Sequence, residues 1–272
     1  MIKEKPIGVF DSGIGGLTVL KALKKLMPKE NFIYFGDTAR VPYGNKSPKT
    51  IVNYSIENTA FLVSKGIKAL VVACNTSSCY SIETLKRKFN IPVIGVVKPA
   101  SLKAVLVSKR KQIGVIGTTS TINSGKYKEE IFKFYKKYYP YLNGKLKIYQ
   151  KACPLFVPLV EEGLHNSNIA YQTANLYLNE LKGKVDTLVL GCTHYPLLKG
   201  VIQDILPNVK IIDSAYQTAL ALRNFLIKFN LLNQENKNPY LKIYVSDKND
   251  NFVRLAKEIL KKDYPIIEKT WE

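Results

Sequence analysis

The segment Ile7-Gly-Val-Phe-Asp-Ser-Gly-Ile-Gly-Gly16 is the most informative part of this sequence for the fold. A short apolar run ends at an acidic residue and a glycine-rich turn, and an amphipathic stretch begins at about Leu17. An apolar run of this kind, followed by a helical pattern, indicates a β-strand that leads into an α-helix. The segment therefore predicts the first strand, turn and helix of an α/β sheet.

The turn itself has two possible interpretations. Its glycines permit positive φ angles and close approach of the backbone to a ligand, and a helix N-terminus offers free N–H groups to a carboxylate or phosphate. The spacing is not that of a dinucleotide-binding Gly-x-Gly-x-x-Gly segment, and the lysine of a P-loop is missing. The turn is thus either an anion-binding turn or a tight structural turn.

The same alternation of strand and helix patterns continues along the chain. It predicts a parallel α/β fold with right-handed crossovers. The expected strands cover residues 6–10, 32–35, 69–73, 92–96, 112–116, 146–149, 187–190, 209–212 and 241–245. The expected helices cover residues 17–27, 50–65, 82–89, 123–138, 170–181, 197–205, 215–228 and 250–261.

A faint internal duplication suggests two related α/β units. Ile113-Gly-Val-Ile-Gly-Thr-Thr119 resembles Ile7-Gly-Val-Phe-Asp-Ser-Gly13, and Leu190-Gly-Cys-Thr-His194 resembles Val72-Ala-Cys-Asn-Thr76. Each unit would contribute one cysteine. Two such sheets facing each other would place the cysteines across a cleft.

Composition excludes several classes of protein. Of the 272 residues, 46% are hydrophobic and 23% charged, which is ordinary globular usage and not that of a disordered chain. Four cysteines are too few for a disulfide scaffold. The N-terminus lacks a signal-peptide pattern, and no apolar run approaches the roughly 18 residues of a membrane span. We expect a cytosolic enzyme with reduced thiols and no membrane partner.

The net charge of +20 raises the question of an anionic partner. Residues 101–151 carry 12 Lys and Arg but only two acidic residues, and aromatic residues are interleaved with the lysines of 126–137. However, only five of the 41 basic residues are Arg, and no nucleic-acid-binding motif is present. A solvated lysine-rich face is therefore favoured over a nucleic-acid interface.

Two cysteines have matching and unusual surroundings. Cys74 and Cys192 each follow a predicted apolar strand and precede polar residues, whereas Cys79 and Cys153 lack this pattern and are interpreted as structural. In open parallel sheets, ligands bind at the carboxyl ends of the strands. A buried apolar role, a metal site and a thiol hydrolase remain alternatives. The metal site is disfavoured because there is no Cys-x-x-Cys pair, and a hydrolase would leave the matched pair unexplained.

Several segments together resemble the glutamate racemases of the cofactor-independent amino-acid racemase superfamily. They span residues 7 to about 214, in the order typical of that family. The segments are Phe10-Asp-Ser-Gly-Ile-Gly-Gly-Leu-Thr-Val19, Gly36-Asp-Thr-Ala-Arg-Val-Pro-Tyr-Gly44, Ala73-Cys-Asn-Thr76, Ile116-Gly-Thr-Thr-Ser-Thr121, Cys153-Pro-Leu-Phe-Val-Pro-Leu-Val-Glu161 and Gly191-Cys-Thr-His-Tyr-Pro196.

The resemblance implies a specific architecture and activity. The fold would be two pseudo-symmetric flavodoxin-like α/β domains with parallel sheets and an active site in the cleft between them. Residues 1–98 plus 212–272 would form the first domain and residues 99–211 the second. The activity would be cofactor-independent interconversion of L- and D-glutamate, supplying D-glutamate for peptidoglycan and cell shape. The family also implies a cytoplasmic homodimer. The alternatives are a racemase for aspartate or another amino acid, and a basic nucleic-acid-binding protein.

The family pattern assigns roles to particular residues. By resemblance, Cys74 deprotonates D-glutamate with help from Asp11, and Cys192 deprotonates L-glutamate with help from Glu161 and His194. Asp11 could instead cap the following helix, and Glu161 could be a surface charge, since Glu162 follows it. The resemblance implies no metal, no pyridoxal phosphate, and substrate contacts from eight positions. These are Ser12, Tyr43, Gly44, Asn75, Thr76, Thr118, Thr121 and Thr193.

Overall fold

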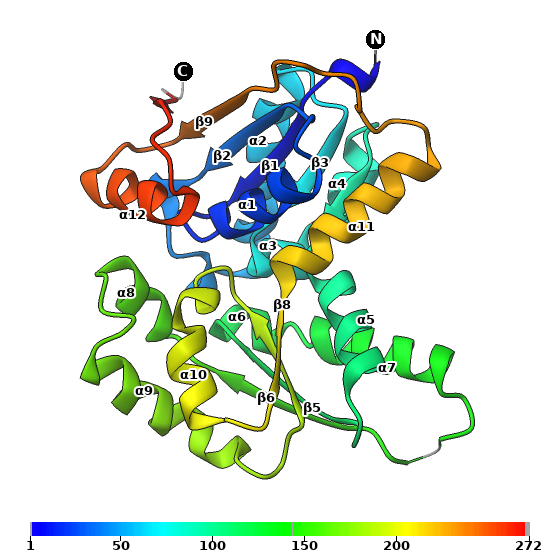
Figure 1. Cartoon of the computed structure of the whole chain (residues 1–272), viewed down its shortest axis with the longest axis vertical. Coiled ribbons are helices and arrows are strands. Elements are labelled where there is room, and N and C mark those ends of the chain that lie inside the picture. Colours follow the sequence, from blue (N-terminus) through cyan, green and yellow to red (C-terminus); the bar gives the residue numbers. More distant parts are fainter. Residues whose placement is uncertain (1, 143, 270–272) are drawn as a thin grey trace. The chain divides into compact units, whose positions relative to one another are not determined.

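A computed structural model describes residues 2–142 and 144–269 of the chain. It divides into two compact units, each with its own sheet (Figure 1). The first unit comprises Met1–Val96 and Ala215–Glu272, so it is discontinuous in sequence, and the second comprises Val97–Ser214.

The first unit contains a six-stranded sheet in the order β10-β9-β2-β1-β3-β4. All neighbouring strands in it are parallel. The five residues of β1 are all buried, as expected for a central parallel strand that is covered on both faces. The strands are β1 (Ile7–Asp11), β2 (Phe32–Gly36), β3 (Ala69–Val72), β4 (Val93–Gly95), β9 (Leu241–Val245) and β10 (Ile266–Glu268).

Helices cover both faces of this sheet. Side chains of α2 and α4, such as Leu62 and Leu85, pack with Phe10, Phe35 and Leu70 of the strands, and α1 packs with α12 (Figure 1). The Ser47 side chain caps α2 by accepting a hydrogen bond from the Thr50 N–H. The helices are α1 (Leu17–Leu26), α2 (Pro48–Ser64), α3 (Asn75–Tyr80), α4 (Ile82–Lys88), α11 (Ser214–Lys228) and α12 (Asp250–Leu260), with short 3₁₀ helices η1 (Ile2–Glu4), η2 (Thr38–Arg40) and η3 (Tyr43–Asn45).

The second unit repeats the strand order in smaller form. Its sheet has the order β6-β5-β7-β8, again with all neighbours parallel, which corresponds to the order β2-β1-β3-β4 of the first unit. The strands are β5 (Gln112–Gly117), β6 (Lys147–Ala152), β7 (Thr187–Gly191) and β8 (Lys210–Asp213). Two parallel sheets of matching order confirm the predicted α/β class.

Helices α8, α9 and α10 pack through Phe156, Ala174 and Ile202 against Leu188 and Leu190 of β7. Helix α5 contacts β7 and α7. The bounds are α5 (Val97–Val107), α6 (Thr119–Asn123), α7 (Lys126–Tyr138), α8 (Phe156–Glu161), α9 (Asn168–Leu178) and α10 (Lys199–Ile205), with 3₁₀ helices η4 (Asn179–Leu181) and η5 (Tyr195–Leu198). Of the described helices, none has both the length and the apolar character needed to cross a bilayer.

Several helices lie where the sequence pattern predicted none. Helices α3, α5, α6 and α8 are extra, and the helix expected at 123–138 begins at Lys126 as α7. Gly125, which has a φ of 65°, separates α7 from α6 and precedes the first turn of α7. Helix α8 carries a proline near its start and α3 contains four polar residues in six, so neither has a strong helical pattern of its own.

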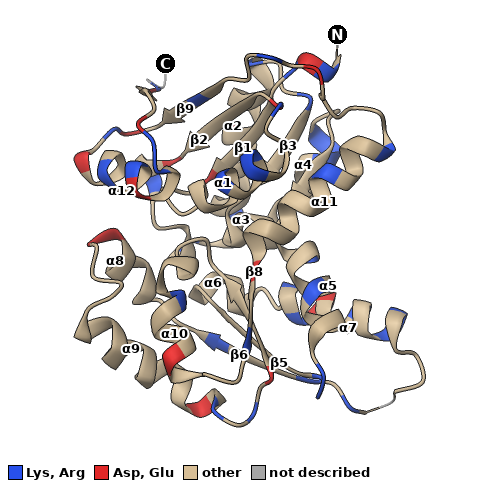
Figure 2. Ribbon diagram, viewed as in Figure 1, with Lys and Arg blue, Asp and Glu red and all other residues tan. Residues whose placement is uncertain are grey.

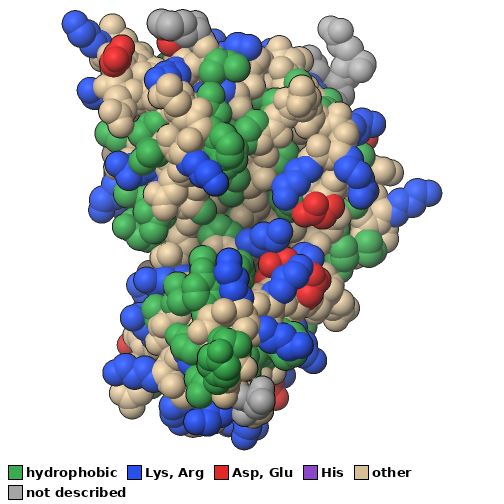
Figure 3. All heavy atoms as spheres, turned by 90° about the vertical axis from the view of Figure 1, so that its right-hand side faces the viewer, with side chains coloured by type: hydrophobic (Ala, Val, Ile, Leu, Met, Phe, Trp, Pro, Cys, Tyr) green, Lys and Arg blue, Asp and Glu red, His purple; other side chains and the backbone are tan. Residues whose placement is uncertain are grey.

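The basic segment of the second unit is largely a solvated helix face. Lysines and arginines are distributed over both units (Figure 2), and they lie between apolar and polar side chains on the face drawn in Figure 3. In α7, Tyr127 and Tyr135 are buried, so half of the interleaved aromatic residues pack inward. Lys126 pairs with Glu129 at 3.0 Å. This arrangement favours the interpretation as a solvated face.

Candidate active site

In each unit, the predicted site residues lie where the strand order reverses. In the first sheet β1 lies between β2 and β3, and in the second sheet β5 lies between β6 and β7. The loops that leave such neighbouring strands in opposite directions form the usual ligand-binding crevice of an open parallel sheet. Asp11 ends β1, and Cys74 follows β3 at a distance of two residues. Cys192 directly follows β7.

Asp11 is completely buried at the carboxyl end of β1. Its Oδ2 accepts a hydrogen bond of 3.0 Å from the Gly13 N–H, so the carboxylate shapes the turn that follows. The Tyr34 hydroxyl donates to the Gly13 carbonyl at 2.7 Å and fixes the same turn from β2. A Cβ on Gly16 would lie 2.3 Å from the Asp11 Cβ, which explains why glycine is required there. The Asp11 carboxylate is therefore held at one position.

The Cys74 thiol lies at the start of α3 and is 4% exposed. It is 3.7 Å from Ser12 Oγ, and its Sγ accepts a hydrogen bond of 3.5 Å from the Ser77 N–H. Burial and the nearby Asp11 charge raise the pKa of Cys74 to about 12, although the contacts with Ser77 and Ser12 act in the opposite direction. At neutral pH, Cys74 is thus a thiol. We call Asp11, Ser12, Cys74 and Ser77 the first thiol cluster.

The other predicted residues of the first unit surround this cluster. Asn75 and Thr76 are buried on α3. Tyr43 is buried in one apolar cluster with Cys74 and Ile51, and Gly44 is half-buried beside it in η3. The structure therefore brings Asp11, Ser12, Cys74 and Tyr43 into one region of this unit.

Cys192, His194 and Glu161 form the second thiol cluster, in the second unit. The Cys192 Sγ lies 3.7 Å from His194 Nδ1, and His194 Nε2 lies 3.1 Å from Glu161 Oε1. Glu161 ends α8 and is partly exposed, whereas the neighbouring Glu162 is exposed. The geometry thus selects Glu161 over Glu162 as the carboxylate that contacts the imidazole.

The charge state of His194 follows from these two contacts. Burial lowers the pKa of His194, but its contacts with Cys192 and Glu161 outweigh burial and raise the pKa to about 10. The ring is therefore an imidazolium at neutral pH. With one nitrogen toward a sulfur and the other toward a carboxylate, the imidazolium can donate a proton to the Cys192 sulfur while staying fixed in orientation.

Aromatic packing holds α8 and the segment after β7 together. The Tyr195 hydroxyl donates to the Cys153 carbonyl at 2.8 Å, and the Tyr195 ring meets Phe156 edge to face at 5.2 Å. These contacts bring the end of α8 to His194. Cys153 is buried, and its burial raises the pKa of the thiol.

Three threonines lie at the strand ends of the second unit. Thr118 follows β5 and caps α6 by accepting a hydrogen bond of 3.3 Å from the Thr121 N–H, and its hydroxyl contacts that of Thr121 at 3.0 Å. Thr193 is 3% exposed between Cys192 and His194. Among residues 2–142 and 144–269, no group of three or more His, Cys, Asp or Glu side chains is arranged to hold a metal ion.

Comparison with known proteins identifies the family. The family model of the Asp/Glu/hydantoin racemases matches residues 7–222. A glutamate racemase from Aquifex aeolicus is 49% identical over 254 residues, which cover 93% of each chain. The chain belongs to the glutamate racemase family.

Solved structures of the family agree with the fold. A glutamate racemase isoform from Bacillus anthracis has 37% identity and a TM-score of 0.91, and the match covers 98% of each chain. A Francisella tularensis glutamate racemase, crystallised in complex with D-glutamate, has 38% identity and a TM-score of 0.89 over 99% of this chain and 98% of that one.

Sequence reasoning missed residues that support the site of this racemase-family chain. Asp37 directly follows β2, a signal of the same kind as Asp11 at the end of β1, yet only its burial and contacts single it out. Tyr34 and Tyr195 read as ordinary strand or loop tyrosines in the sequence. Both side chains are fully buried, and their hydroxyls donate to the carbonyls of Gly13, in the turn after Asp11, and of Cys153, just before α8.

Proposed function

We propose that this chain interconverts L- and D-glutamate with Cys74 and Cys192 as the two acid–base groups. The observation that carries the proposal is the matched placement of two buried thiols, each after the corresponding strand of its sheet and each with its own polar partners. A single base returns a proton to the face it left. Two thiols acting on opposite faces of one substrate give inversion.

The proposed steps balance one proton removed and one delivered. In the L-to-D direction, the Cys192 thiolate takes the α-proton and the Cys74 thiol donates its proton to the opposite face. The enzyme is left with a Cys192 thiol and a Cys74 thiolate, which is the form that accepts D-glutamate. His194 and Asp11 are placed to assist the return of protons at the two sulfurs.

The remaining predicted residues would bind the substrate. Ser12, Asn75, Thr76, Thr118, Thr121 and Thr193 offer small polar groups, while Tyr43 and Gly44 would contribute through their backbone. The α-proton of an amino acid is very weakly acidic, so the developing carbanion requires pre-organised donors in a site that excludes water. We also propose, from the family, that the enzyme is a cytoplasmic homodimer that supplies peptidoglycan synthesis, and light scattering tests the dimer.

The first experiment is a racemase assay in heavy water with metal-stripped, pyridoxal-free protein and L-glutamate. Circular dichroism follows optical activity, and NMR follows deuterium at Cα. We expect the loss of optical activity and the gain of deuterium to proceed together, and both to be faster with L-glutamate than with L-aspartate. The proposal is refuted if folded, reduced protein shows no inversion and no deuterium exchange. A faster rate with aspartate would instead assign an aspartate racemase.

Serine substitutions test the two-base mechanism. We expect Cys74→Ser and Cys192→Ser each to lower kcat/KM by at least about 10³-fold, because an alcohol is a far weaker acid than a thiol. Cys79→Ser, which changes a half-buried thiol outside the proposed mechanism, serves as the matched control and should retain activity. Substantial turnover in either of the first two variants would contradict the mechanism.

A further inference from the structure

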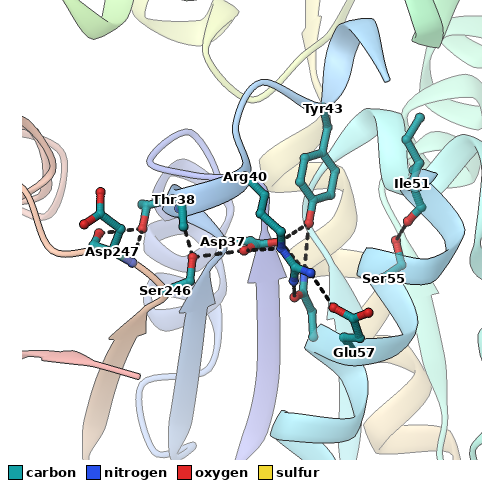
Figure 4. Close-up of polar contacts among 11 residues, drawn as sticks. Asp37, Thr38, Arg40, Tyr43, Ile51, Ser55, Glu57, Ser246 and Asp247 are labelled. Carbon is teal, nitrogen blue, oxygen red and sulfur yellow. Dashed lines mark hydrogen bonds and ion pairs between the residues drawn. The ribbon is translucent and has the colours of Figure 1, made fainter. Parts of the chain in front are cut away.

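A buried carboxylate with no assigned role lies beside the first thiol cluster. Asp37 directly follows β2 and is 0% exposed, and its N–H donates to the Asp11 carbonyl at 3.0 Å. Its side chain is the centre of a polar network that joins three separate segments of the first unit (Figure 4). A fully buried charge needs several hydrogen bonds to be stable, and this one has them.

The most informative partner of Asp37 is the Tyr43 hydroxyl. It donates to Asp37 Oδ2 and accepts a hydrogen bond of 3.1 Å from Asn58 Nδ2. Burial and the Asp37 charge raise the pKa of Tyr43 further above its usual range, so the hydroxyl remains a donor. The Tyr43 side chain is therefore directed into the protein, and residues 43–44 can meet a substrate only through their backbone.

Helix α2 holds the network from one side. Arg40 Nε lies 2.8 Å from Asp37 Oδ2, and its guanidinium reaches Asn58 Oδ1 at 3.0 Å and the carboxylate of Glu57 (Figure 4). The guanidinium also lies 4.1 Å from the centre of the Tyr54 ring, which in turn packs beside Tyr43 at 5.5 Å.

The segment after β9 holds the network from the other side. Ser246 Oγ donates to Asp37 Oδ1 at 2.9 Å and accepts from the Ala39 N–H at 2.9 Å. The Asp247 N–H donates to Thr38 Oγ1 at 2.9 Å. The loop between β2 and α2 is thus fixed to a part of the chain that follows it by about two hundred residues.

We propose that Asp37 is a positioning residue that, through the Tyr43 hydroxyl, fixes the backbone of residues 43–44 beside Cys74 for substrate binding. This inference rests on the proposed racemase function. Tyr43 packs directly in the apolar cluster of Cys74, so a shift of this ring moves both the binding backbone and the wall beside the thiol.

The test compares Tyr43→Phe and Asp37→Asn with Tyr54→Phe. Tyr43→Phe keeps the ring and removes only the bond to Asp37, whereas Tyr54→Phe removes a hydroxyl that is not bonded to Asp37 from the same cluster. For the first two variants we expect KM for glutamate to rise about tenfold and kcat to stay within about twofold of the wild type. This is the result when the bound substrate and the transition state lose the same binding energy. The control should match the wild type.

Hydrogen exchange gives a second readout that does not depend on turnover. The Lys46 N–H donates to the Tyr43 carbonyl at 3.1 Å, so its exchange should accelerate in Tyr43→Phe and Asp37→Asn. Unchanged KM and exchange would overturn the inference while leaving the racemase function intact. A fall in kcat at constant KM would also overturn it, because it would indicate only a smaller folded fraction. A wild type without racemase activity would refute the function, and exchange alone would then test the positioning.

Discussion

Cys74 and Cys192 have chemically different surroundings. The Cys74 pKa is raised to about 12 beside a carboxylate, whereas Cys192 contacts an imidazole whose own pKa is raised to about 10. At neutral pH the first cluster therefore holds a thiol and the second an imidazolium. In the proposed mechanism, L-glutamate binds to the form that has a Cys192 thiolate beside this imidazolium and a Cys74 thiol in the first cluster.

Replacing Glu161 should change the pH dependence of the reaction. The Glu161 contact helps to raise the His194 pKa to about 10, so Glu161→Gln should let the imidazolium lose its proton at a lower pH. We expect the alkaline limb of kcat/KM to move down by about one pH unit. Glu162→Gln makes the same chemical change on an exposed neighbour and should leave the profile unchanged. An unmoved limb in Glu161→Gln would show that this contact does not control the titration.

At the scale of elements, the turn between β1 and α1 depends on a glycine. A Cβ at Gly16 would lie 2.3 Å from Asp11 Cβ and 2.8 Å from Tyr34 Oη, and both neighbours are fully buried. Neither can move without disturbing a strand. The turn can therefore take only glycine, and its shape fixes the Asp11 carboxylate.

Gly16→Ala should accordingly destabilise the protein and impair the site. We expect a loss of about 1–3 kcal/mol in the free energy of unfolding, as for overpacking, together with a large fall in kcat/KM. Gly200→Ala is the matched control, because a Cβ at Gly200 in α10 has no neighbour within 4 Å. This control should be neutral or slightly stabilising. Urea unfolding measures the stability of both variants. A Gly16→Ala protein as stable as the wild type would contradict the steric argument.

The elements also show which patterns predict structure well. Most strands and longer helices have clear apolar runs or amphipathic periods, and these were predicted to within a few residues, but strand β10 was not predicted. The eleven-residue helix α5 was also missed. The six-residue helices α3 and α8 were missed because their helical state depends on packing: Ser77 is buried in α3, and Phe156 and Val160 of α8 are fully buried in the core of the second unit. Short helices of this kind are stabilised by tertiary contacts more than by propensity.

At the scale of the whole molecule, one buried ion pair joins distant parts of the first unit. Lys68 Nζ lies 2.6 Å from Glu30 Oε2, with side-chain exposures of 1% and 0%. The ammonium also donates to the carbonyls of Lys3 and Leu231, and Glu30 accepts from the Asn233 N–H. Burial raises the pKa of Glu30 and lowers that of Lys68, so burial opposes both charges and the pairing geometry compensates.

Removing one member of this pair should be costly. We expect Lys68→Met to lower the free energy of unfolding by about 3–5 kcal/mol, because it leaves Glu30 buried without its counter-charge. Lys86→Met, in the exposed pair with Glu83, should cost at most about 1 kcal/mol. Urea titration measures both. If Lys68→Met were as stable as the wild type, Glu30 would have to be uncharged or satisfied by other groups.

The surface charge leads to a further prediction at this scale. With a net charge of +20 distributed over both units, the protein should bind DNA only through non-specific attraction. If a mobility shift appears at low salt, we expect the affinity for DNA to fall about 10³-fold or more between about 50 and 200 mM salt. The affinity should be equal for unrelated sequences. A shift that persists with sequence preference would instead support a nucleic-acid interface on this chain.

The sequence by itself determined the parallel α/β class, the presence of two related α/β units, and the position of two thiols just after corresponding strands. These features are local, since apolar runs, glycine turns and polar residues at strand ends are visible within about ten residues. Only the tertiary structure decided that the Tyr43 hydroxyl turns inward, that Glu161 and not Glu162 meets His194, and that Asp37 is buried. Asp37 and Ser246 are 209 residues apart, and no local pattern reports whether a carboxylate will find such a donor. Burial of a charge is decided by partners that only the folded chain brings together.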